Sequence, residues 1–266
     1  MKLGAAAGLI VACASTPQPT HQTSASISSS DGEVVSITDG DTIEVMTGEG
    51  EITVRLAAIN TPDEGECHHR AATSRIEEVL SRALVSLEIV GVDQFDRTLA
   101  HVFVDERHVN LEMVSAGLAV VSDPDATDPH GSALLDAEDD AFDSRVGLWA
   151  GDACGATDPP PGVAIDPAGS RPDPPGPDDH VLTEELVAIV NRSGDTVDIG
   201  GWTLRDTSSR HRFVFPEGTS LRPREVVEVD SGAAGWDPGG SPVWNNDGDM
   251  ALLLDAAGRV VSRWRY

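Results

Sequence analysis

The chain has 266 residues, 39% of them hydrophobic, which is enough apolar material for one or two globular cores. A wholly disordered protein is therefore excluded. The 45 acidic residues outnumber the 18 basic ones and give a net charge of −27, with Lys2 the only lysine, which excludes a histone-like binder of nucleic acids. Runs of eighteen apolar residues are missing, which excludes a polytopic membrane protein.

Residues 1–13 have the layout of a secretory signal, with one positive residue, a small and apolar run, and Cys13. The last four of them, Ile-Val-Ala-Cys, resemble the cleavage box of bacterial lipoprotein signals, which implies a lipidated N-terminus at Cys13. A plain signal peptide with an incidental cysteine is the alternative. Residues 14–31 are rich in Ser, Thr, Pro and Gln and are expected to be a flexible tether. We expect an exported protein, held on the extracellular face of the cell membrane through Cys13 or secreted.

The region 32–154 is predicted to be a β-rich α+β unit, a small closed barrel of the OB-fold type. Its first strand-like runs are residues 34–37, 42–46 and 52–59. Asp-Gly and Gly-Glu-Gly turn signals separate them, which predicts three consecutive antiparallel strands. Apolar residues then recur at helical spacing over 71–84, and the region ends in an acidic helical pattern near 132–144. Five strands with about three helices are typical of an OB-fold barrel.

Residues 155–179 contain eight of the 17 prolines and are predicted to be a stiff linker. Residues 180–266 show short strand-like runs between turn signals, which predicts an all-β antiparallel sandwich. The charge is uneven, since residues 33–150 carry 25 acids against 7 arginines (−18), and 180–266 carry 13 acids against 9 arginines (−4). With a linker between two cores, residues 32–155 are expected to fold alone.

Polar residues at the ends of the barrel strands point to phosphate chemistry. They are Asp39-Gly40-Asp41-Thr42, Arg55, Asn60-Thr61-Pro62-Asp63 and Asp96-Arg97. Carboxylate and carbonyl oxygens on turns suit a hard cation such as calcium. Two arginines close by suit a phosphate and the charge that develops as it is cleaved. Taken singly, each piece is also typical of an ordinary turn or a surface ion pair.

In this order the motifs resemble the staphylococcal nuclease (thermonuclease) family, over roughly residues 33–150. The matching stretches are VVSITDGDTIEV, VRLAAINTPDEGEC, DQFDRTLAHVFVDERHVNLEMVSAGLAVV and VGLW. The resemblance implies a hydrolase, a Ca2+-dependent phosphodiesterase that cuts DNA and RNA. It implies that Asp41 ligates calcium through its side chain, with Asn60 and the Thr61 carbonyl beside it.

The same resemblance assigns the catalytic side chains. It implies that Arg55 and Arg97 bind the scissile phosphate and that Asp63 is the general base. Asn60 stands where the family prototype has Asp, and Asp63 stands where it has Glu, one methylene longer. A catalytic group misplaced by about 1 Å loses on the order of a hundredfold in rate. Two alternatives stay open: Glu64 takes the role of the base, or the chain is a weak or inactive nuclease fold that binds nucleic acid or a surface.

Three cysteines allow one disulfide with one cysteine left over. In an exported chain Cys67 and Cys154 can pair and close a loop of about 88 residues, and a thiol–metal site with His68 and His69 is the weaker alternative. The C-terminal region resembles the lamin tail domain, an immunoglobulin-like sandwich, in GGWTLRD, HRFVFPEGTSLRP and SPVWNNDGDMALLLDAAGRVV. This implies a binding or spacing module with an unknown ligand, in a chain that we expect to be a monomer.

Overall fold

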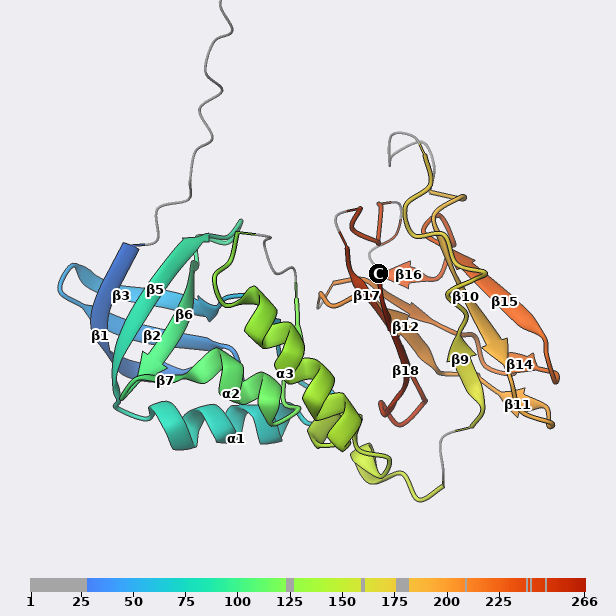
Figure 1. Cartoon of the computed structure of the whole chain (residues 1–266), viewed down its shortest axis with the longest axis horizontal. Helices are drawn as coiled ribbons and strands as arrows, with labels where there is room; N and C mark the ends of the chain where they lie inside the picture. Colours follow the sequence, from blue (N-terminus) through green and yellow to red (C-terminus); the bar gives the residue numbers. More distant parts are fainter. Residues whose placement is uncertain are drawn as a thin grey trace, which may run out of the picture.

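The computed structural model describes residues 28–122, 127–158, 161–175, 182–208, 210–237, 239, 241–246 and 248–266. The expected signal, Cys13 and most of the expected tether lie outside these ranges. The described chain forms two β-rich units, a barrel and a sandwich, that lie side by side (Figure 1). In this part of the chain no helix has the length and apolar character needed to cross a membrane.

The first unit is a closed barrel of the OB-fold type with helices packed beside it, as the sequence predicted. Its strand order is β3-β2-β1-β5-β6, and β3 closes the ring by pairing in parallel with β6. The first three strands run antiparallel in sequence order. The elements are β1 (Ser28–Ile37), β2 (Thr42–Thr47), β3 (Gly50–Leu56), β4 (Ile59–Asn60), α1 (His69–Leu80), β5 (Leu84–Val92), β6 (Thr98–Val104), β7 (Arg107–His108), α2 (Val109–Ser115), β8 (Val120–Val121), α3 (Gly131–Ser144), η1 (Gly147–Trp149) and η2 (Ala153–Gly155).

Two boundaries of the barrel differ from the prediction. The tether was expected to reach residue 31, but β1 begins at Ser28 because its first residues pair with β5. The first helix was expected over 71–84, but α1 ends at Leu80 because Arg82 has a left-handed backbone (φ 57°). The chain then turns directly into β5. The spacing of the helix is nevertheless the one predicted, with its buried residues facing the barrel core.

The second unit is a β-sandwich. Its sheets have the orders β15-β10-β9 and β16-β13-β12-β17-β18, with β11 and β14 paired separately. The elements are β9 (Val163–Ile165), β10 (Leu186–Asn191), β11 (Val197–Asp198), β12 (Thr203–Arg205), β13 (Arg212–Val214), β14 (Ser220–Leu221), β15 (Val226–Asp230), β16 (Trp236–Asp237), β17 (Met250–Leu254) and β18 (Val260–Arg265). The predicted linker 155–179 is wrong where it meets the sandwich, because β9 lies inside it and pairs with β10. The sandwich therefore begins before residue 180.

Strand β17 joins the two units. Its residues alternate between two apolar cores: Ala251 and Leu253 lie in the core of the sandwich, whereas Met250 and Leu252 pack with Leu148 and Trp149 of the barrel unit. Side chains of a strand alternate between its faces, so both faces of β17 are buried. The barrel and the sandwich therefore share a third core, although the sequence suggested that a linker separates them, and folding of residues 32–155 alone stays a prediction.

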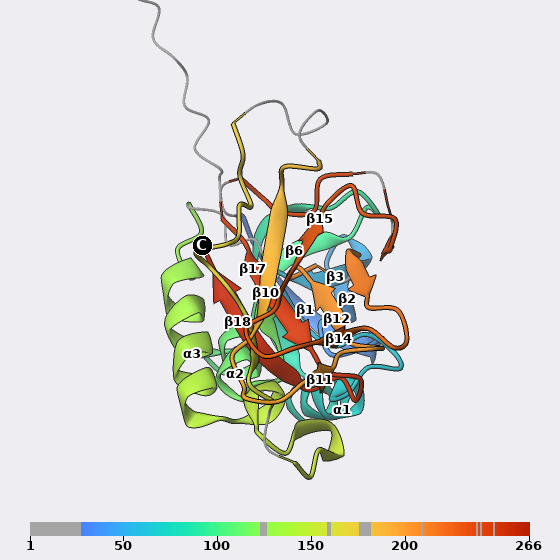
Figure 2. The ribbon, with the colours of Figure 1, turned by 90° about the vertical axis from the view of Figure 1, so that its right-hand side faces the viewer.

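Polar contacts line the same junction, where α3 lies against β18 (Figure 2). Glu138 of α3 is fully buried, and its Oε2 accepts a hydrogen bond from Arg265 Nη2 at 2.8 Å. Arg263 pairs with Asp139 and lies over the ring of Phe142, with its guanidinium carbon 3.9 Å from the ring centre. The sandwich thus supplies cations to an acidic helix of the barrel unit.

Candidate active site

The turn between β1 and β2 carries the Asp-Gly-Asp-Thr motif at the edge of the barrel. A Cβ added to Gly40 would lie 2.7 Å from the Cβ of Ala72 in α1 and 2.8 Å from Oγ1 of Thr61. Only glycine lets the turn approach this closely. The motif therefore brings Asp41 down between α1 and the strand end at Thr61.

Asp41 is buried, and both oxygens of its carboxylate have partners. Its Oδ2 accepts hydrogen bonds from the backbone N–H of Thr61 at 2.8 Å and from the Thr61 hydroxyl at 2.9 Å. Its Oδ1 forms an ion pair with Arg55, whose Nη2 donates to Oδ1 of Asn60 at 2.6 Å. The predicted residues Asp41, Arg55, Asn60 and Thr61 thus form one connected cluster. Strands β2 and β3 place the two charges, since Thr42 lies opposite Arg55 in the antiparallel register.

The cluster suits a hard cation. It offers only oxygen donors: the carboxylates of Asp39 and Asp41, the amide oxygen of Asn60 and the oxygens of Thr61. Burial and the nearby charge of Asp41 raise the pKa of Asp39, so two carboxylates are held closer together than their charges favour. The amide nitrogen of Asn60 is buried without a hydrogen-bond partner among the described residues. Calcium at this cluster would relieve the repulsion between the acids.

The side chain of Arg97 makes its ion pair outside this cluster, but its position in the sheet is close to that of Arg55. It immediately precedes β6, and Thr98 pairs with Val54, the neighbour of Arg55. Its Nε and Nη2 both lie 2.7 Å from Oδ2 of Asp93. The side chain of Arg97 is 31% exposed, and its guanidinium lies 5.4 Å from the ring centre of the exposed Phe95. A cation and an aromatic face therefore lie together just before β6.

The predicted base, Asp63, lies on a loop that contacts the sandwich. Its Oδ2 lies 2.8 Å from Nη2 of Arg212, and its backbone N–H donates to Oε2 of Glu66 at 2.8 Å. Burial and the charge of Glu66 raise the pKa of Asp63, while Arg212 and Arg205 act in the opposite direction. Glu64, the alternative base, is exposed.

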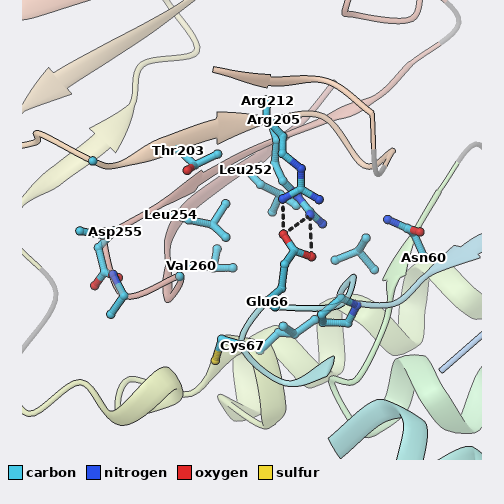
Figure 3. A pocket seen from close by; sticks show the side chains of 18 residues that line it. Asn60, Glu66, Cys67, Thr203, Arg205, Arg212, Leu252, Leu254, Asp255 and Val260 are labelled. Atoms are coloured by element: carbon cyan, nitrogen blue, oxygen red, sulfur yellow. Dashed lines mark hydrogen bonds and ion pairs between the residues drawn. The ribbon is translucent and has the colours of Figure 1, made fainter. Parts of the chain in front are cut away.

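Sequence reasoning missed Glu66, Arg205 and Arg212. Glu66 accepts hydrogen bonds from Arg205 Nη1 at 3.2 and 3.4 Å and forms an ion pair with Arg212. Burial raises the pKa of Glu66, but Arg205 and Arg212 outweigh burial and hold it below its ordinary value. These arginines line a cavity of about 230 Å³ between the two units (Figure 3). The sequence signal that could have indicated this arginine pair was one arginine in each of two adjacent short strands.

The loop that carries Asp63 is also fixed on the barrel side. Cys67 and Cys154 form a disulfide with a Cα–Cα distance of 5.5 Å, the pair expected from the sequence. Both sulfurs lie near His68, but sulfurs in a disulfide are not thiolate ligands, which argues against the thiol–metal alternative. Nδ1 of His69 lies 2.9 Å from the carbonyl oxygen of Pro62. The loop is therefore held at both of its ends.

Comparison with known proteins identifies both units. Residues 53–151 match the family of staphylococcal nuclease homologues, and residues 164–266 match the lamin tail domain. An uncharacterized endonuclease of Haemophilus influenzae is 35% identical over 118 residues, which cover 44% of this chain and 65% of that protein. An uncharacterized endonuclease of Escherichia coli O157:H7 is 34% identical over 119 residues, covering 44% of this chain and 76% of that protein. A micrococcal nuclease of Shigella flexneri is 32% identical over 127 residues, covering 44% of this chain and 72% of that protein.

The nuclease match begins at residue 53, so it covers Arg55 and Asn60 of the cluster, whereas Asp41 lies on the turn that precedes the matched range. The lamin tail match begins inside β9, in agreement with the strand pairing that extends the sandwich before residue 180. The chain belongs to the staphylococcal nuclease homologue family, with a lamin tail domain following the nuclease domain.

Proposed function

We propose that this protein is a calcium-dependent nuclease that hydrolyses phosphodiester bonds of DNA and RNA. The observation that carries the proposal is the buried cluster in which Arg55 lies between Asp41 and Asn60. A guanidinium and oxygen ligands at one barrel edge combine a phosphate clamp with a place for a hard cation. Relatives named as endonucleases support the same reaction class.

The proposed roles follow the positions of the residues. Asp41, Asn60 and Thr61 would hold calcium, which when bound supplies positive charge that polarises the phosphate. Arg55 and Arg97 bind the phosphate oxygens. Asp63 accepts a proton from the attacking water, the bond from phosphorus to the 5′ oxygen breaks, and Arg97 stabilises the charge on that leaving oxygen.

Digestion of denatured DNA and of RNA by the purified chain tests this function. We expect cleavage with calcium and none with excess chelator. The isosteric change Asp41→Asn is expected to abolish cleavage, because it removes the negative charge that faces Arg55 and the cation. Asp105→Asn, at an exposed turn of the same barrel, is the matched control and is expected to cut normally. Full activity in excess chelator would refute the calcium mechanism.

A catalytically weak relative that binds nucleic acid is the second candidate. It is favoured by the ion pair between Arg97 and Asp93, which occupies the phosphate clamp in the free protein. Binding of denatured DNA with no cleavage at any calcium concentration would support this candidate instead.

We also propose that the protein is exported, with the membrane contacted only through a lipid on Cys13. The disulfide between Cys67 and Cys154 supports export, because disulfides persist in oxidising compartments. Metabolic labelling with a fatty acid, compared between the wild type and Cys13→Ser, tests the anchor. Equal labelling of both proteins would contradict it.

A further inference from the structure

The lamin tail domain presents two arginines side by side toward the nuclease domain. Arg205 of β12 and Arg212 of β13 are directly opposite each other in the antiparallel register. Like charges directly opposite each other destabilise a sheet. Arg205 is also nearly buried, with 7% of its side chain exposed, and burial lowers its pKa. Such a pair requires an anion from outside the sheet.

Glu66 of the nuclease domain supplies that anion. Its carboxylate points up from the loop toward both guanidinium groups (Figure 3). The same carboxylate accepts a hydrogen bond from the backbone N–H of Asp63 at 2.8 Å. Glu66 therefore also stabilises the fold of the loop that carries both residues. The arginine pair and the local fold of the loop are thus coupled through one side chain.

Arg212 extends this network to the proposed base. Its Nη1 pairs with Glu66, and its Nη2 lies 2.8 Å from Oδ2 of Asp63. Among the residues that the structure describes, Arg212 is the only one that hydrogen-bonds the carboxylate of Asp63. The side chain of Asp63 is 46% exposed, so the contact with Arg212 leaves part of it open to water. The planar guanidinium fork fixes the direction of the carboxylate without covering it.

We propose that Arg212, held beside Arg205 by Glu66, is a positioning residue for Asp63, so that the lamin tail domain completes the nuclease site. The proposal rests on the function proposed above. Asp63 is one methylene shorter than glutamate, and the contact with Arg212 holds its carboxylate in one position. The role expected for the lamin tail domain from its family, spacing or binding without catalysis, is thereby extended to support of the chemistry.

The test uses full-length Arg212→Met, with Arg263→Gln as the matched control. Arg263 also crosses the domain junction but pairs with Glu138 and Asp139, away from the loop. We expect Arg212→Met to lower kcat about a hundredfold, since a catalytic group would be misplaced by about 1 Å, with KM nearly unchanged. Arg263→Gln should change neither quantity.

A second measurement does not depend on cleavage. Hydrogen exchange of the loop that spans Asp63 to Cys67 should quicken in Arg212→Met and stay at the wild-type rate in Arg263→Gln, because the bond from Asp63 N–H to Glu66 is coupled to the arginine pair. Arg212→Lys keeps the charge but loses the fork and should be intermediate in both assays. Unchanged exchange, unchanged kcat or raised kcat in Arg212→Met would overturn the positioning role. A wild type that never cuts but shows the exchange response would refute the nuclease function and leave the positioning contact standing.

Discussion

Truncation of Leu252 to alanine tests whether the two domains share a core. Leu252 is 1% exposed and packs with Leu148 and Trp149 of the barrel unit. A buried Leu→Ala change costs about 2–5 kcal/mol, which comprises the lost transfer free energy and the cavity left behind. One kcal/mol shifts the midpoint by roughly 2–4 °C in a chain of this size, so the expected fall is roughly 4–20 °C.

The assay is thermal unfolding of the full chain, followed by far-UV circular dichroism and by calorimetry. Val214→Ala is the matched control: it removes apolar atoms from the same sandwich, but at a side chain that is 51% exposed. Changes at exposed sites usually stay within about 0.5 kcal/mol. If Leu252→Ala lowered the midpoint no more than Val214→Ala does, the shared core would not form in solution and the two domains would be independent.

Two further predictions concern the disulfide and the histidine cluster. Replacing Cys67 and Cys154 by serine should lower the free energy of unfolding by roughly 4 kcal/mol in the chain-entropy model, measured by urea titration with and without reductant; identical midpoints for wild type and variant without reductant would contradict it. Burial, followed by the charges of His101 and His130, lowers the pKa of His108 to about 3. Below about pH 6.5 the unfolded state therefore binds a proton at this histidine, whereas the folded state does not until the pH approaches 3. The contribution of neutral His108 to the free energy of unfolding is complete above about pH 6.5 and is lost as the pH falls toward 3. His108→Phe should therefore flatten the decline of urea midpoints between pH 7 and pH 4.5, and an unchanged slope would refute this reasoning.

The barrel was predictable because its signals are local, whereas its cluster was predictable from the order of motifs that resembles the nuclease family. The turn motif around Gly40 and the alternation in the first strands specify how the chain folds within a few residues. The ordered motifs then bring Asp41, Arg55 and Asn60 to one edge of the barrel. The contact of Arg97 with Asp93 was not predictable in the same way, because it depends on the rotamer of a half-buried side chain.

The junction between the domains could not be predicted from the sequence, for a physical reason. The run Met250–Leu254 indicates a buried strand, but a pattern of burial on both faces does not say which unit covers the second face. The strand β9 was hidden by composition, since Val163–Ile165 lies among prolines that dominate the region.

The uneven charge of the chain has a further consequence at this junction. The excess acid lies on the nuclease domain, and sandwich arginines meet part of it: Arg212 reaches Asp63 and Glu66, and Arg265 reaches the buried Glu138. A buried carboxylate that lost its cation would be strongly destabilised, so these contacts select one arrangement of the two domains over others. One of the same arginines lies against the proposed base. Charge complementarity between the domains therefore fixes their relative orientation and, through Arg212, the direction of the Asp63 carboxylate.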